Sequence, residues 1–180
     1  MLDLDQFIGD LRKTLGERSR QALREVVARA VADPAALLKR IGTPEKAAVQ
    51  VLHQGPDLTV LNVIWAPKQV TFPHDHRMGA VIGMYGGRED NVYWRRVPSP
   101  AKFQIEPAGG EALGGGDTAI LGRDVIHSVL NPLEKLSGAI HVYEGPFLTT
   151  ARSMWNCETL TEEPYDIRVA VKGMPIEMAS

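Results

Sequence analysis

Two histidines flank a single aspartate in the segment Pro73-His74-Asp75-His76. In an extended chain the side chains at i and i+2 project from one face, so both imidazoles point the same way and Asp75 points the other way. One metal ion can accept both rings in that arrangement. Paired histidines of this kind also occur as ordinary core or surface residues, and the motif alone gives the two interpretations equal weight.

A third histidine, His127, lies in a short apolar segment that closure of a β-barrel would bring beside the first pair. Three neutral imidazoles suffice to bind zinc, iron, nickel or copper, and the spacing does not identify the metal. No acid or cysteine occupies a corresponding position soon after His76. Three ligands on one side of an octahedral ion would leave three positions open, which is room for a bidentate substrate and dioxygen.

A fourth histidine, His141, stands two residues before Tyr143, so strand alternation puts both side chains on one face. One interpretation is a buried histidine that is hydrogen-bonded to a tyrosine in the core. His53 lies outside these segments and receives no role.

Helices are expected to cover the first 42 residues, followed by short strands. One apolar stripe recurs at helical spacing: Leu23, Val26, Val27, Ala30 and Val31. Asp33-Pro34 and Gly42 are the start and stop signals of a short helix over 35–41, and Thr43-Pro44 repeats the start signal.

From about residue 58 the pattern changes to period two. Short segments rich in Val, Ile, Tyr or Trp are expected to be strands: 59–65, 79–85, 91–97, 118–121, 127–130 and 139–143. Gly and Pro clusters between them, including Pro107-Ala108-Gly109-Gly110, predict turns. Many short strands without intervening helices indicate an antiparallel sandwich or barrel.

Length and composition fit one globular domain. The chain has 180 residues, a formal net charge of -2, 44% hydrophobic and 23% charged residues. We expect N-terminal helices over 1–46, a barrel over 47–150 and an extension over 151–180 that packs on the barrel.

The charge balance gives no reason to expect binding to nucleic acid or to a membrane. The single cysteine, Cys157, excludes an intramolecular disulfide and a cysteine-cluster zinc site, and it is expected to be a buried structural thiol. The acidic N-terminus lacks the features of a signal peptide, and no apolar run approaches the roughly 20 residues of a membrane span. A cytoplasmic location is therefore expected.

These segments together resemble the cupin superfamily and, within it, the thiol dioxygenases related to cysteine dioxygenase and 3-mercaptopropionate dioxygenase. The similarity covers about half of the chain, from Thr59 to Phe147. A His-x-His pair without the usual cupin glutamate, together with a later His-x-Tyr, is more specific than the general cupin signature. The resemblance implies a mainly β cupin fold, a double-stranded β-helix or jelly-roll barrel, preceded by the N-terminal helical segment.

The resemblance also implies that His74, His76 and His127 hold a mononuclear non-haem iron(II), with zinc or nickel as alternative occupants in isolated protein. It makes His141 and Tyr143 catalytic, with the Tyr143 hydroxyl directed at iron-bound oxygen and His141 orienting it. The activity implied is oxidation of a small thiol carboxylic acid by dioxygen to its sulfinate. Because cupins commonly associate, a homodimer is compatible with the resemblance, and the sequence does not fix the oligomeric state.

Three departures from the family pattern concern the substrate and the tyrosine. A cysteine that crosslinks to the tyrosine in animal enzymes is absent after His76, and Ala139 replaces a serine that often precedes the histidine of the His-x-Tyr pair. The arginine that binds the cysteine carboxylate in animal enzymes has no upstream counterpart. Arg152 and Gln50 match substrate-binding residues of the mercaptopropionate-type enzymes, and Arg95-Arg96 is a competing pair.

Two other functions share these residues. A related three-histidine cupin cleaves carbon–carbon bonds of diketones, and an apolar cavity with Arg152 and Gln50 pointing away would favour that activity. Alternatively, the barrel is a metal-binding or small-molecule-binding module without turnover. Its docking surface would then be the basic helices, with Arg18, Arg20 and Arg24 as contacts, although most such charges are ordinary solvated residues.

Overall fold

The N-terminal segment folds as three helices, and each begins at a side chain that caps it. The computed structural model describes residues 3–17, 19–98 and 104–178. Its N-terminal helices are α1 (Leu4–Gly16), α2 (Arg20–Val31) and α3 (Pro34–Ile41). Asp3, Ser19 and Asp33 accept hydrogen bonds from backbone N–H groups of the first turn of the helix that follows. None of these helices, nor the short α4, is long and apolar enough to cross a membrane.

The short helix α3 begins and ends at the residues that the sequence indicated. Asp33 is its N-cap, proline occupies its first turn, and Gly42 follows it with a φ of 86°, which favours glycine. The expectation of a further helical turn after Thr43-Pro44 was wrong. That segment is irregular and leads directly into the first strand.

The remainder of the described chain is mainly strand. The strands are β1 (Ala48–Gln54), β2 (Thr59–Trp65), β3 (His74–Asp75), β4 (Ala80–Gly86), β5 (Arg88–Val97), β6 (Gln104–Gly114), β7 (Thr118–Leu121), β8 (Ile126–Leu130), β9 (Ser137–Tyr143), β10 (Ser153–Trp155), β11 (Glu162–Pro164) and β12 (Ile176–Met178). The helix α4 (Ile167–Ala170) lies between β11 and β12. All six segments expected to be strands contain one, with bounds that differ by up to three residues.

The strand order is that of a jelly roll. One sheet has the order β12-β1-β2-β9-β4-β7 and the other has the order β11-β10-β3-β8-β5-β6. Within the eight central strands, β2 pairs with β9, β3 with β8, β4 with β7 and β5 with β6, all antiparallel. This nested pairing results when one long antiparallel hairpin rolls into two facing sheets. The fold is therefore the double-stranded β-helix of cupins.

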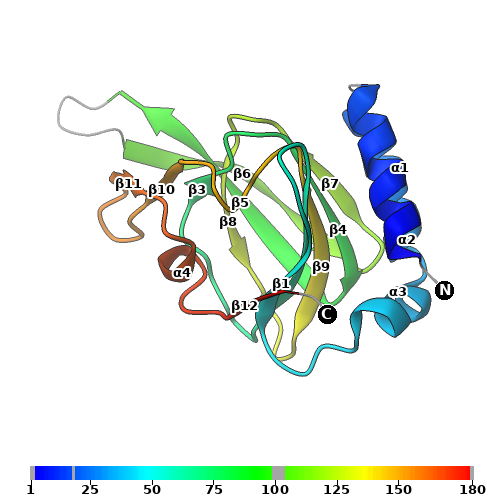
Figure 1. The fold of residues 1–180 in the computed structure, drawn as a ribbon. Coiled ribbons are helices and arrows are strands. Elements are labelled where there is room, and N and C mark those ends of the chain that lie inside the picture. The colour runs from blue at the N-terminus through cyan, green and yellow to red at the C-terminus, as the bar shows by residue number, and fades with distance from the viewer. Residues whose placement is uncertain (1–2, 18, 99–103, 179–180) are drawn as a thin grey trace.

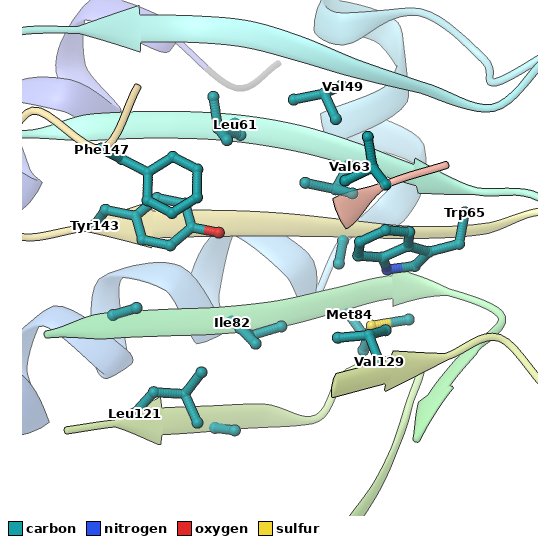
Figure 2. Packing of buried hydrophobic residues seen from close by; sticks show 14 of the residues in the cluster. Val49, Leu61, Val63, Trp65, Ile82, Met84, Leu121, Val129, Tyr143 and Phe147 are labelled. Atoms are coloured by element: carbon teal, nitrogen blue, oxygen red, sulfur yellow. The ribbon is translucent and has the colours of Figure 1, made fainter. Parts of the chain in front are cut away.

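Helices cover one side of the barrel and the C-terminal segment covers the other (Figure 1). Helix α2 packs on β4 and β7, so the sheet that contains them is buried on both faces. This explains why β2 is buried at every position and shows no alternation. The second face of that sheet contributes to the apolar barrel interior, where Val49, Leu61, Val63 and Trp65 lie (Figure 2).

One expected turn proved to be strand. Pro107-Ala108-Gly109-Gly110 lies inside β6, which forms a long hairpin with β5. The pairing shifts register there, with Trp94 opposite Pro107 and Tyr93 opposite Gly109. Proline and glycine are tolerated because β6 is an edge strand with a bulge, where a missing N–H breaks no ladder.

Candidate metal centre

Three histidines meet inside the barrel. His74 on β3 lies directly opposite His127 on β8, and His76 follows β3 immediately. The Nε2 atom of His76 lies 3.3 Å from that of His74 and 3.0 Å from that of His127. All three rings are buried, and their ligand atoms lie within 4.8 Å of one another.

Hydrogen bonds orient two of these rings. His74 Nδ1 lies 2.8 Å from the Phe72 carbonyl oxygen, and His127 Nδ1 lies 2.7 Å from Asn91 Oδ1. Both oxygens accept, so each Nδ1 carries the proton and each Nε2 presents a lone pair to the cluster. Asp75 points away, as alternation requires, and binds Arg77 and the Ser153 N–H.

The three rings are suited to a cation. Burial lowers the pKa of His74 to about 4, and burial together with the neighbouring rings lowers the pKa of His76 and His127 well below 6.5. All three are therefore neutral near pH 7, which is the state that binds metals. The separations of His76 Nε2 from His74 Nε2 and from His127 Nε2, 3.3 and 3.0 Å, are those of imidazole nitrogens that bind one ion at about 2.1 Å. The donor set thus fits a metal ion, with no carboxylate among the three ligands.

His141 and Tyr143 face this cluster from β9 in the opposite sheet. His141 Nδ1 lies 3.2 Å from the Tyr143 hydroxyl oxygen. The Tyr143 ring stands edge-on to His76, with 5.0 Å between centroids, and stacks on Phe147 at 3.7 Å (Figure 2). Burial raises the pKa of Tyr143, so the phenol is protonated at neutral pH.

Two polar residues behind the site, Glu89 and Asn91 on β5, were not predicted from the sequence. Both are buried, and Asn91 Nδ2 donates to Glu89 at 3.0 Å. Their i and i+2 spacing places them on one face of the strand. Alternation alone does not tell which face of the strand points inward. The opposite face carries the apolar residues Val92 and Trp94, so the sequence favours that face as the buried one.

Arg152 is a buried cation beside the site. Its side chain is sandwiched between the Phe147 ring at 3.9 Å and the Tyr165 ring at 3.7 Å. Nη1 donates to the backbone carbonyls of Phe147 and Thr150, whereas Nε has no hydrogen-bond partner. Within residues 3–17, 19–98 and 104–178, no carboxylate lies within 4 Å of its guanidinium.

Gln50 does not reach the cluster. Its neighbours Val49 and Val51 point into the barrel interior, so alternation turns Gln50 to the outer face of β1. There its Oε1 accepts a hydrogen bond from Asn62 Nδ2. The Gln50 side chain therefore points away from the histidine cluster, and the expectation that it binds a substrate there is corrected.

The competing arginines and the basic helix residues have other partners. Arg95 pairs with Glu106, and Arg96 pairs with Glu162. Arg20 pairs with Glu144, and Arg24 donates to Thr118. Arg18 lies outside the described residues.

Two tryptophans and the cysteine lie in different surroundings. Trp65 packs in the barrel interior, whereas Trp94 is partly buried against a small separate cluster. The expectation of a buried Cys157 was wrong: this thiol is exposed in a turn of the C-terminal extension.

A cavity of about 30 Å³ lies beside the histidines, enough for roughly one or two waters. His74 and His127 line it from one sheet and His141 and Tyr143 from the other. Apolar side chains form most of the remaining lining, among them Val49, Leu61, Val63, Val129, Phe147 and Val171. Tyr165 and Ile167 of the C-terminal segment also line it. The C-terminal segment after Arg152 therefore helps to close the site. In the sequence, Tyr165 is an aromatic residue between a proline and Asp166, which caps a helix, and this pattern could have indicated that it is partly buried.

No protein-family model matches the chain. Among solved structures, oxalate decarboxylase from Bacillus subtilis at pH 4.6 is 18% identical, covers 51% of this chain and 22% of that one, and gives a TM-score of 0.40. The formate complex of Lactobacillus farciminis oxalate decarboxylase is 16% identical over 51% of this chain and 25% of that one, with a TM-score of 0.40.

An RmlC-like cupin from Methanocaldococcus jannaschii with a double-stranded β-helix fold is 8% identical over 58% of this chain and 85% of that one, with a TM-score of 0.48. The present chain thus spans a quarter or less of these oxalate decarboxylases. At such identities the likeness extends to the fold alone. What the fold and the site together establish is a cupin barrel with a three-histidine cluster suited to a metal ion.

Proposed function

We propose that the protein is an iron(II)-dependent thiol dioxygenase that oxidises a small thiol carboxylic acid to its sulfinate. One observation carries the proposal: a three-imidazole cluster without a carboxylate ligand lies near the buried guanidinium of Arg152, which has no acidic partner among the described residues. A buried cation of this kind is costly unless a ligand neutralises it. A substrate with one carboxylate and one metal-binding group would satisfy both features.

The reaction balances without a further reactant. One thiol and one dioxygen give one sulfinic acid, with both oxygen atoms bound to sulfur, so sulfur is oxidised and dioxygen is reduced. His74, His76 and His127 would hold a ferrous ion, which would supply the redox chemistry of the reaction.

Side chains in the cavity and Arg152, which lies against the cavity residues Phe147 and Tyr165, bind the substrate and move its proton. Arg152 binds the carboxylate through a charge-assisted contact, and the apolar walls exclude water. The thiol proton passes by way of the Tyr143 hydroxyl to His141 Nδ1, 3.2 Å away. The small cavity, about 30 Å³ in volume, favours short substrates.

The test compares thiols that differ in the carboxylate. Dioxygen uptake and sulfinate formation are measured for iron-loaded protein with 3-mercaptopropionate, with cysteine and with propanethiol. We expect uptake with a carboxylate-bearing thiol, a much higher KM for propanethiol, and a KM at least tenfold higher in Arg152→Lys, because lysine lacks the planar fork. Full iron loading with no uptake for any thiol would reject the proposal.

A second candidate, cleavage of a diketone, is favoured by the apolar cavity wall and by the outward orientation of Gln50. The same dioxygen measurement with pentane-2,4-dione distinguishes it. Uptake with the diketone and none with thiols would establish this activity, and bound metal without uptake for either class would indicate a module that binds without turnover.

A further inference from the structure

A buried carboxylate connects the histidine cluster with the Tyr143 side of the cavity. Glu89 has no exposed surface. Its Oε1 accepts a hydrogen bond from Asn91 Nδ2 at 3.0 Å. Its Oε2 accepts one from Trp65 Nε1 at 2.7 Å and lies 3.4 Å from His141 Nε2, at ion-pair distance.

The first arm of this network fixes the orientation of the Asn91 amide. An ionised carboxylate can only accept hydrogen bonds, so Asn91 must turn its NH₂ group toward Glu89. Its Oδ1 then faces His127 Nδ1 at 2.7 Å, and that nitrogen must donate. The lone pair of His127 is consequently on Nε2, which is the atom that faces His76 Nε2 at 3.0 Å.

The second arm favours one proton position on His141. Within the described residues His141 Nε2 makes no hydrogen bond, but the Glu89 carboxylate oxygen 3.4 Å away electrostatically favours the tautomer that carries its proton on Nε2. His141 Nδ1 then has a free lone pair, and the Tyr143 hydroxyl lies 3.2 Å from it. The carboxylate is also placed to stabilise the imidazolium that forms if His141 takes up a second proton.

Glu89 is ionised despite its burial. Burial acts to raise the pKa of the carboxyl, but His141 and the hydrogen bonds from Trp65 and Asn91 outweigh it and lower the pKa below its ordinary value. Three partners therefore hold the carboxylate in one position.

We propose that Glu89 is a positioning residue that sets hydrogen-bond direction in both arms of the site. Through Asn91 it keeps His127 Nε2 free to bind a metal ion, and through His141 Nε2 it keeps Nδ1 free to accept the Tyr143 proton. Ala139 replaces the serine of the resembling family, and a carboxylate from the neighbouring sheet occupies the far side of His141 instead. The inference rests on the metal site of the proposed function and is independent of its reaction.

Glu89→Gln changes the direction of these hydrogen bonds, while the shape of the side chain stays almost the same. Trp65 can only donate, so the amide oxygen must stay at the Oε2 position and the NH₂ group falls next to Asn91. Asn91 then has to turn its oxygen toward residue 89 and its NH₂ toward His127. His127 Nδ1 becomes an acceptor, its proton moves to Nε2, and the metal ligand is lost.

The first experiment titrates Zn(II) and Co(II) into the chelator-treated native protein and the variants, without thiol. Affinity is expected to fall at least tenfold in Glu89→Gln, in the range typical for groups that hydrogen-bond to metal-binding histidines. Asp90→Asn, which removes a neighbouring carboxylate that pairs with Arg88, is the matched control and should bind as the native protein does. Equal affinity in Glu89→Gln and native protein would overturn the inference.

A second measurement needs no variant to fold. Long-range ¹H–¹⁵N spectra of the native zinc-loaded protein report which ring nitrogen of His141 carries a proton. We expect a proton on Nε2, and a proton on Nδ1 alone would refute the proposal. Neither measurement involves thiol oxidation, so absence of dioxygenase activity would leave both results interpretable.

Discussion

At the scale of single residues, the site combines neutral ligands, one protonated phenol and two charged groups in an apolar interior. The lowered pKa of each clustered histidine follows mainly from burial. Two charged side chains are buried behind residues that line the cavity: Glu89 lies beside His141, and Arg152 lies against Phe147 and Tyr165. Each charge is held by specific contacts, so substitutions should separate metal binding from proton movement.

Removal of one clustered imidazole should abolish most metal binding. In His127→Ala a third of the donor set is lost, and we expect metal content after dialysis to fall at least tenfold, measured by elemental analysis. His53→Ala is the control, because His53 lies outside the cluster and contacts Arg12. Unchanged metal content in His127→Ala would mean that the cluster is structural.

Tyr143→Phe tests the hydroxyl separately from the ring. The stacking on Phe147 and the edge contact with His76 remain, so we expect native-like stability and metal content. Loss of the proton path should lower kcat of thiol oxidation by about 10²-fold or more, measured as dioxygen uptake at saturating substrate. A kcat equal to that of the native protein would exclude Tyr143 from the reaction.

At the scale of elements, the barrel positions the site because strands from both sheets contribute to it. His74 and His127 come from one sheet, and His141 and Tyr143 come from the other. Helix α2 supports the sheet of β4 and β9 from outside (Figure 1). It approaches β4 closely at Gly83.

A methyl group at Gly83 should separate α2 from β4. A Cβ there would lie 2.5 Å from Val27 Cγ1 and 3.1 Å from Val31 Cγ1, and both side chains are buried. We expect Gly83→Ala to lower the free energy of unfolding by about 1–3 kcal/mol, as overpacking does. Urea denaturation measures this, with Gly86→Ala on the same strand as the control because nothing lies within 4 Å of its Cβ position. Equal losses in both variants would argue against close packing at Gly83.

At the scale of the whole molecule, stability and metal binding should both depend on the protonation of the histidine cluster. The unfolded chain binds a proton on His74 near pH 6.5, whereas the folded chain binds it near pH 4. His76 and His127 are shifted in the same direction. The unfolded state therefore binds more protons between these pH values, and acid favours unfolding.

Metal-free protein should lose stability as the pH falls from 6.5 toward 4. Each such histidine contributes about 1.4 kcal/mol per pH unit in that window. Urea denaturation at several pH values measures the slope, in a His53→Gln background because the pKa of His53 is also lowered. The pKa values of Glu89 and Glu162 are also lowered, so their protonation destabilises the fold only below about pH 4.5. The loss of stability from the histidines occurs at higher pH and can be measured separately. A flat profile between pH 6.5 and 5 would contradict the buried, neutral state of the cluster.

The sequence alone determined the features that depend on local spacing. Period-two segments gave the positions of the main strands, capping residues gave α3, and the His-x-His and His-x-Tyr pairs identified side chains that share a face. Each of these follows from bond geometry within a few residues. The cluster of His74, His76 and His127 required one further assumption, a closed barrel, which the fold satisfies.

Tertiary structure decided which strand faces point inward and what they meet. Gln50 turns outward while Glu89 and Asn91 turn inward, because pairing with distant strands sets those faces and composition does not. Long-range contacts also place Arg152 between its aromatic neighbours. Pairing with β5 places Pro107 in an edge strand. A single-residue change of register reverses every side chain of a strand, so contacts remote in sequence determine the surroundings of the site.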